Sequence, residues 1–156
     1  PFNAWVISKS LETLSVRMER HCDNALALAR SLESDRRIRW VRYPFLESHP
    51  QHDLAARQMH GFGGILSFEL DGDLADAKAF LEGLSEFTLA VSLGGVESLI
   101  ELPAAMTHEP IPKAAREALG ITDSLIRVSV GIEHVDDLIG DLEAGFDRIA
   151  LTPASN

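Results

Sequence analysis

The sequence has little cysteine and few basic residues, and no long apolar run. Cys22 is the only cysteine in 156 residues, which excludes an internal disulfide and fits a reducing compartment. Lysine and arginine number 14 against 24 acidic residues, and the resulting net charge of -10 argues against nucleic acid or an anionic membrane as a partner. No stretch approaches the roughly 18 apolar residues of a membrane span, and no signal peptide pattern is present. We therefore expect a soluble, cytoplasmic protein.

The apolar content and the length predict one ordinary domain. Apolar residues make up 46% of the chain, enough to build a core in 156 residues. The sequence opens at Pro1 without an initiator methionine, and an apolar helical pattern is already under way at Phe2 and Trp5. We expect a chain that was processed or that is the tail of something longer.

A long helix is predicted from residue 3 to about residue 33. Apolar residues recur there at spacings of three and four, as on one buried helical stripe. Ser8 and Ser10 mark a possible break, because short hydroxyl side chains favour helix caps over helix interiors. The stripe consists of Leu11, Leu14, Met18, Cys22, Ala25, Ala29 and Leu32.

Strands and helices alternate along the rest of the chain. Each predicted strand has polar residues on one face, which is typical of an antiparallel sheet rather than a buried parallel one. The expected fold is a single α+β domain, residues 1–156, with a mainly antiparallel sheet covered by helices. The predicted strands cover 38–43, 65–70, 87–91, an extended segment ending at Pro103, and 125–131. The predicted helices cover 53–60 with Asp53 as N-cap, 73–84, 113–119 ended by Gly120, and 135–149.

Arg127 is a cation on an otherwise apolar strand. The segment LIRVSVG alternates, with Ile126, Val128 and Val130 on one face and Arg127 on the other. A guanidinium cannot lose its charge, so Arg127 faces either water or a planar anion such as a carboxylate. The pattern leaves both a solvated sheet face and a substrate site open.

Other candidate sites have weak signals. His49, His52 and Asp53 form the only histidine cluster, and we expect solvated loop histidines there rather than a metal site, since further ligands are lacking. GFGG at 61–64 and SLGG at 92–95 are similar to phosphate-binding turns but lack the spacing of a dinucleotide fingerprint or a P-loop. Cys22, on the apolar stripe, is expected in the core rather than as a nucleophile. Thr107 and His108 are predicted to lie in a loop.

Several long motifs resemble, in order, those of the Cys/Met-metabolism family of pyridoxal-phosphate (PLP) enzymes of transsulfuration. The likeness runs through essentially the whole chain and covers the C-terminal part of that family. The resemblance implies the small C-terminal domain of a PLP enzyme of fold type I, with residues 1–34 as a long helix joining it to a large PLP-binding domain. The motifs are PFNAW at 1–5, ETLSVRMERHCDNAL at 12–26, YPFLESHPQHDLAARQM at 43–59, SFEL at 67–70, AVSLGGVESLIELPAAMTH at 90–108 and GITDSLIRVSVGIE at 120–133.

The family's large domain carries the lysine that binds PLP, and no counterpart of that lysine motif is present. Lys9, Lys78 and Lys113 all lie in predicted helices without it. The resemblance therefore implies that the isolated chain is inactive and that PLP is bound mainly by the large domain. It also implies an amino-acid substrate, the large domain itself as a partner, and a homotetramer.

Carried over residue by residue, the resemblance makes Arg127 the residue that binds the substrate's α-carboxylate. Ser92 and Leu93 would line the same pocket, Ser92 near the PLP lysine, and Thr107 would form a wall of the site. Cystathionine-handling members usually carry a glutamate at the position of Val91, where it can pair with a distal ammonium. An apolar Val91 favours γ-elimination or γ-replacement on methionine or O-acylhomoserine-type substrates.

Two alternatives remain at this stage. GGVESL and ELPAAMTH look more like the cystathionine gamma-synthase and gamma-lyase enzymes, so cystathionine is the alternative substrate. The absent lysine also fits a non-catalytic α+β module that binds an amino acid or mediates assembly. An in-frame large domain encoded upstream of Pro1 would exclude the module.

Overall fold

The structure, a computed structural model, describes residues 1–61 and 63–149. Phe62 of the 61–64 turn, and residues 150–156 of the predicted domain 1–156, lie outside the described residues. The helices are α1 (Phe2–Leu11), α2 (Leu14–Glu33), α3 (His52–Gln58), α4 (Leu74–Glu82), the 3-10 turn η1 (Pro103–Ala105), α5 (Lys113–Ala118) and α6 (Val135–Phe146). The strands are β1 (Ile38–Arg42), β2 (Ile65–Leu70), β3 (Thr88–Leu89), β4 (Leu99–Glu101) and β5 (Leu125–Ser129).

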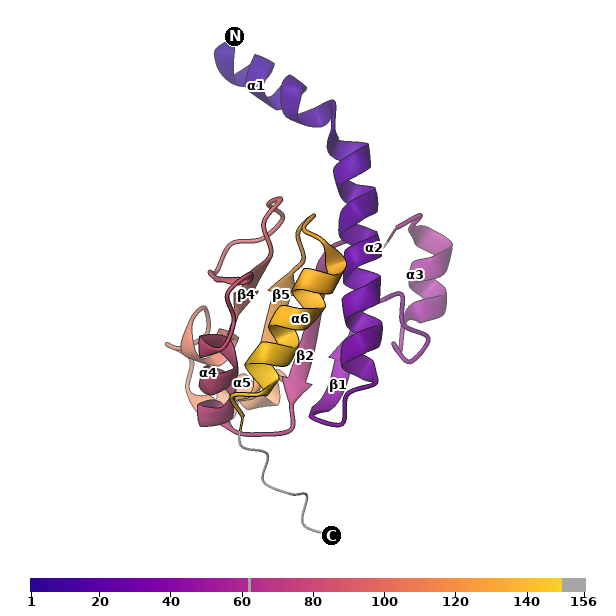
Figure 1. The fold of residues 1–156 in the computed structure, drawn as a ribbon. Coiled ribbons are helices and arrows are strands. Elements are labelled where there is room, and N and C mark those ends of the chain that lie inside the picture. The colour runs from indigo at the N-terminus through magenta and orange to yellow at the C-terminus, as the bar shows by residue number, and fades with distance from the viewer. Residues whose placement is uncertain (62, 150–156) are drawn as a thin grey trace.

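The five strands form one sheet in the order β1-β2-β5-β4-β3, seen behind the helices in Figure 1. The β1–β2, β2–β5 and β4–β5 pairs are antiparallel, while β3 and β4 run parallel. The prediction of an α+β domain with a mainly antiparallel sheet is confirmed. Strand β5, which carries Arg127, lies at the centre of this sheet.

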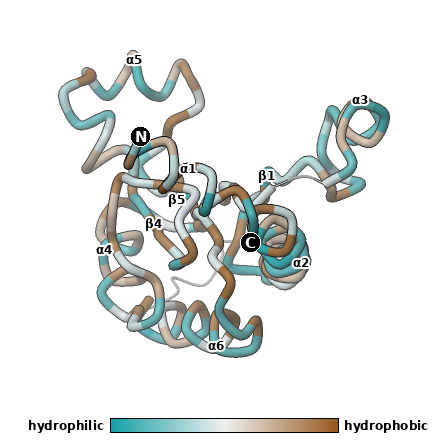
Figure 2. The backbone as a smooth tube through the Cα atoms, turned by 90° about the horizontal axis from the view of Figure 1, so that it is seen from above, coloured by the Kyte–Doolittle hydropathy of each residue, from teal (hydrophilic) through white to brown (hydrophobic). Residues whose placement is uncertain are grey.

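The core lies between one face of the sheet and three helices. Figure 2 shows α2, α4 and α6 along one side of the sheet and α5 on the other. Ile126 and Val128 of β5 are fully buried on the covered face, as the alternation predicts. Phe80 of α4 packs edge-on against Phe68 of β2, with ring centroids 6.0 Å apart, and on the other side contacts Phe146 of α6. Arg127 therefore points to the face that these three helices leave open.

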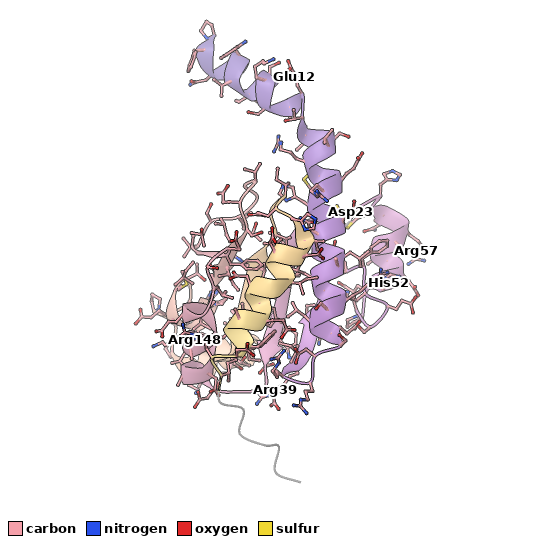
Figure 3. The ribbon with its side chains drawn as sticks, in the orientation of Figure 1. Glu12, Asp23, Arg39, His52, Arg57 and Arg148 are labelled. Carbon is pink, nitrogen blue, oxygen red and sulfur yellow. The ribbon has the colours of Figure 1, made fainter. Side chains whose placement is uncertain are left out.

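The long helix predicted over 3–33 is broken near its beginning, but at Glu12 and Thr13, between α1 and α2, rather than at Ser8 or Ser10 (Figures 1 and 3). Ser10 does not end α1, since its hydroxyl donates to the Val6 carbonyl oxygen within the helix. Arg17 spans the break instead. Its side chain donates to the Ser10 carbonyl oxygen at 2.6 Å and to the Thr13 hydroxyl at 3.2 Å. The guanidinium thus satisfies a carbonyl that the end of α1 leaves free.

The apolar stripe is buried only in its second half, which corrects the prediction. Ala25, Ala29 and Leu32 are in the core, whereas Leu11, Leu14 and Met18 are exposed because α2 extends beyond the sheet at that end. No residue of α1 is buried, although the helix carries Phe2 and Trp5.

Smaller differences concern the ends of elements. The predicted strand 87–91 is reduced to Thr88 and Leu89, and the helix after Pro50 begins with Gln51, rather than Asp53, as its N-cap. Asp73 caps α4 as predicted and forms a capping box with Asp76. Gly120 ends the α5 region with a φ of 80°, a conformation that favours glycine. No helix in the described part of the chain is long and apolar enough to cross a membrane.

Candidate functional site

The site is organised around Arg127 on β5, the strand that pairs with β2 on one side and with β4 on the other. In the sheet register it stands beside Ser67 of β2 on one side and Glu101 of β4 on the other. Its Nη2 atom donates to the carbonyl oxygens of Val91 and Ser92, each at 3.1 Å, and lies 3.1 Å from Oε2 of Glu101. The side chain keeps 22% of its surface exposed. Arg127 thus has a carboxylate partner and an exposed part at the same time.

Glu101 is a buried carboxylate with a second partner. Its side chain is only 2% exposed, and its Oε1 atom accepts a hydrogen bond from the Thr107 hydroxyl at 2.9 Å. The same hydroxyl lies 2.9 Å from Nδ1 of His108. A hydroxyl has one proton, so when Thr107 donates to Glu101 the His108 nitrogen donates to Thr107.

The SLGG segment at 92–95 is a loop held against the end of β5. The amide of Gly94 donates to the Ser129 hydroxyl at 2.8 Å, and Ser129 lies two residues beyond Arg127 on the same face of the strand. Gly94 has a φ of 80°, which side chains other than glycine rarely adopt. The loop therefore approaches Arg127 with backbone carbonyls and Ser129 with a backbone amide.

The far end of this loop is anchored by Glu133. The carboxylate of Glu133 accepts hydrogen bonds from the amide and the hydroxyl of Ser98 at 2.6 and 2.9 Å. The Ser98 hydroxyl in turn accepts from the amide of Gly131 at 2.8 Å. Val96 lies so close that a Cβ atom on Gly131 would stand 2.3 Å from its carbonyl oxygen. Only glycine fits at position 131, where the chain passes close to the backbone of Val96.

The predicted site residues come together in part. Val91 and Ser92 contact Arg127 through their carbonyl oxygens, and the side chains of Val91 and Leu93 are 55% and 56% exposed. Leu93 shares the loop with Ser92, while Thr107 reaches Arg127 only through Glu101. The sequence leaves water and a planar anion open as surroundings of Arg127, and the structure places the Glu101 carboxylate beside a guanidinium that is still partly exposed.

Cys22 is half-buried, not in the core as predicted. It lines an open cleft of about 560 Å³. One side of the cleft is formed by residues of α2, among them Met18 and Leu26, and the other side by Phe45, His60 and Gly61. A Cβ atom on Gly61 would stand 3.1 Å from its sulfur. His21 and Asn24, on either side of Cys22 in the sequence, are buried and contact the carbonyl oxygens of Val130 and Gly131, so Cys22 lies on another side of α2, toward the cleft.

The histidine cluster is engaged in local hydrogen bonds near α3, where Figure 3 labels His52. Nδ1 of His52 lies 3.0 Å from the Pro44 carbonyl oxygen, and Nδ1 of His49 accepts from the Gln51 amide. Burial, and then the charge of Arg42, lower the pKa of His49. Over residues 1–61 and 63–149, no three His, Cys, Asp or Glu side chains are grouped to hold a metal ion.

The lysines of the chain do not fit a covalent PLP site beside Arg127. Lys9 pairs with Glu12 on α1, and Lys113 pairs with Asp123 next to α5. Lys78 lies on α4, which packs through Phe80 against the covered face of the sheet, opposite to Arg127. The site therefore offers groups for an anion and none for covalent attachment of the cofactor.

Sequence reasoning missed Glu101, although a signal was present. Glu101 stands between Ile100 and Leu102, which makes it a lone charge on an apolar strand, as Arg127 is. Two such charges of opposite sign in one predicted sheet indicate a cross-strand ion pair. The roles of Ser129 and Glu133 depend on where the loop crosses β5, which no spacing in the sequence predicts.

Comparison with known proteins matches the chain to one family model and to enzymes of sulfur amino-acid metabolism. The family model of the Cys/Met metabolism PLP-dependent enzymes matches residues 1–147. The chain is 56% identical over 144 residues to a cystathionine beta-lyase from Coxiella burnetii, and 48% identical over 149 residues to an L-methionine gamma-lyase from Fusobacterium nucleatum subsp. polymorphum. These matches cover 92% and 96% of the chain but 37% and 38% of the relatives.

A solved structure has the same fold. A cystathionine gamma synthase from Xanthomonas oryzae pv. oryzae, determined in complex with cystathionine, superposes with a TM-score of 0.88 at 50% identity. The match covers 95% of this chain and 38% of that one. The chain thus spans well under half the length of the proteins it is similar to.

Proposed function

Because the chain belongs to the Cys/Met metabolism PLP-dependent enzyme family, we propose that it is the C-terminal, substrate-orienting domain of a longer enzyme of sulfur amino-acid metabolism. The reaction is elimination or replacement at the γ-carbon of a methionine- or O-acylhomoserine-type amino acid. PLP, held mainly by residues outside this chain, supplies the carbanion chemistry.

The observation that carries the proposal is the partly exposed guanidinium of Arg127 beside the 92–95 loop. Val91, Ser92 and Glu101 engage one nitrogen, Nη2, and no described residue bonds Nη1. A planar guanidinium matches a carboxylate, so Arg127 binds the α-carboxylate of the substrate. Fixing the carboxylate fixes the dihedral about the α-carbon, and with it which bond is oriented for reaction.

The substrate preference rests on Val91 and Leu93. Both apolar side chains are more than half exposed, one on each side of Ser92, whose carbonyl contacts Arg127. Such a surface suits an uncharged methionine or O-acyl side chain and cannot pair with a distal ammonium. In the full-length enzyme, Ser92 would lie near the PLP lysine of the large domain.

Cystathionine is the second candidate substrate. Relatives with the names cystathionine beta-lyase and cystathionine gamma synthase match nearly the whole chain at 50% identity or more. The motifs GGVESL and ELPAAMTH support the same candidate. The two candidates differ at the distal end of the substrate and share the carboxylate site.

The chain by itself folds but neither holds PLP covalently nor turns over substrate. Its core is complete within α2, α4, α6 and the sheet, while its three lysines are engaged or placed away from Arg127. Circular dichroism of the purified 156-residue chain should show a cooperative transition. A visible absorption band of covalently bound PLP on that chain would contradict the proposal.

The proposal is tested by replacing Arg127 in the full-length holoenzyme. Arg127→Ala should lower kcat/KM by about 30- to 1000-fold, because a charge-assisted bidentate contact is lost, without changing PLP content. Arg127→Lys should recover little, since an ammonium lacks the planar fork. Arg42→Ala, on an exposed arginine of the same sheet, serves as a control that should leave kcat/KM within about 2-fold. An unchanged kcat/KM in Arg127→Ala would mean that Arg127 does not bind the substrate and only faces solvent on the sheet.

A further inference from the structure

The ion pair between Glu101 and Arg127 is incomplete. A carboxylate and a guanidinium can pair through two parallel hydrogen bonds, yet Oε2 and Nη2 of these two groups are 3.1 Å apart and Oε2 makes no hydrogen bond to a described residue. Oε2 of Glu101 and Nε of Arg127 are both buried atoms without a hydrogen bond in the described part of the chain. Buried polar atoms without a hydrogen bond are costly, so other contacts must favour this incomplete pairing.

Thr107 provides one of these contacts. The Thr107 hydroxyl donates to Oε1 of Glu101 at 2.9 Å and so holds this oxygen toward Thr107, whereas a two-point pair would need it beside a second nitrogen of Arg127. The backbone carbonyls of Val91 and Ser92 hold Nη2 from the other side. These contacts together favour the arrangement in which Glu101 meets Arg127 at Nη2 alone.

We propose that Glu101 is a positioning residue that sets how tightly Arg127 binds the substrate carboxylate, and that Thr107 limits its hold on the guanidinium. This inference rests on the proposed function of Arg127. Glu101 competes with the substrate carboxylate for Arg127, because its buried negative charge weakens the electrostatic attraction between Arg127 and a second carboxylate. Release of the product, which keeps the α-carboxylate, is eased by the same competition.

The proposal gives opposite signs for two substitutions. Glu101→Gln keeps the shape and the hydrogen bonds, since an amide can face Arg127 with its oxygen and Thr107 with its nitrogen, but it removes the repelling charge. KM should fall on the order of 10-fold, as expected for one like charge removed several ångströms from the bound carboxylate. Thr107→Val frees Oε1, so Glu101 closes on the fork and KM should rise on the order of 10-fold.

The measurement uses the full-length holoenzyme and whichever of L-methionine or L-cystathionine it turns over. A second probe is 3-(methylthio)propylamine, which lacks the carboxylate and whose Ki as a competitive inhibitor should not change. Glu69→Gln is the matched control, because Glu69 is also buried and paired with an arginine, Arg39, at 3.1 Å. It should lower Tm as much as Glu101→Gln without changing KM.

The double variant separates this mechanism from loss of structure. If Thr107 acts only through Glu101, Thr107→Val should no longer raise KM once Glu101 is glutamine. A KM that rises in Glu101→Gln, or a full Thr107→Val effect in the double variant, overturns the proposal. Should Glu101→Gln fail to fold, Thr107→Val on the exposed Thr107 decides alone, and an unchanged KM there overturns it. If Arg127→Ala itself leaves KM unchanged, the proposed function fails instead.

Discussion

The carboxylate of Asp141 on α6 accepts two hydrogen bonds from Ser85, one from its amide at 2.7 Å and one from its hydroxyl at 3.0 Å. It also accepts from the amides of Glu86 and Phe87 at 2.9 and 3.0 Å. One buried side chain thus pairs three successive amides just before β3, and places the strand that leads into the 92–95 loop.

Asp141→Ala should destabilise the chain by about 2–4 kcal/mol, since three amides lose a charged acceptor in a buried position. Urea unfolding of the 156-residue chain measures the loss. Asp136→Ala, on the same helix and 81% exposed, is the control and should cost less than about 1 kcal/mol. Equal losses in the two variants would show that Asp141 contributes no more than a surface charge.

Gly131→Ala should damage the site more than the fold. The new Cβ atom would stand 2.3 Å from the Val96 carbonyl oxygen, so the 92–98 loop has to shift away from β5. A displacement near 1 Å at a substrate-orienting group lowers kcat/KM by about 100-fold.

Gly140→Ala tests the same change without the crowding, because nothing lies within 4 Å of a Cβ atom there. Gly140 lies within α6, and alanine should add about 0.5–1 kcal/mol of stability with unchanged kcat/KM. Full activity in Gly131→Ala would mean that the loop tolerates the shift.

Val91→Glu tests the substrate preference in the full-length enzyme. For methionine or an O-acyl substrate, a carboxylate placed at the distal end stays unpaired or protonated, and kcat/KM should fall by about 10-fold or more. Cystathionine has a distal ammonium that can pair with it, so its relative kcat/KM should rise. Both substrates are measured on one preparation, and an equal change in both would remove the basis of the preference.

The loss of stability in acid should include the contribution of the ion pair between Asp35 and Arg37, measured as the free energy of unfolding against pH. Hydrogen bonds from Arg37 hold the pKa of Asp35 below its ordinary value of 3.8. The unfolded chain therefore binds more protons between pH 4 and the lowered pKa, and the stability from this pair is present above about pH 4 and is lost as the pH falls. Asp35→Asn should remove about 1 kcal/mol at pH 7 and progressively less as the pH falls below about 4. Parallel pH profiles for both proteins would contradict this assignment.

The sequence predicts those features that depend on local spacing. Alternation alone places Ile126 and Val128 in the core, and the charge of Arg127 marks it as needing a partner. The position of the break near Thr13 escapes prediction because side-chain bonds from Arg17 complete it. The lone charge of Glu101 indicates a cross-strand partner, but only the strand order, which places β4 beside β5, makes that partner Arg127. Met18 is exposed because α2 extends beyond the edge of the sheet, and the spacing of apolar residues along a helix does not show where the sheet ends.

The parallel pairing of β3 and β4 makes the 90–98 segment a connection between strands as well as the loop that contacts Arg127. Antiparallel neighbours can be joined by a tight turn, but parallel ones require the chain to travel back before it pairs again. Deletions in this segment would leave β4 unable to reach its place beside β5. Evolution and engineering can therefore change the side chains on this loop much more freely than its length. New specificities should arise here through substitutions such as those at Val91 and Leu93, with the spacing from Leu89 to Leu99 kept.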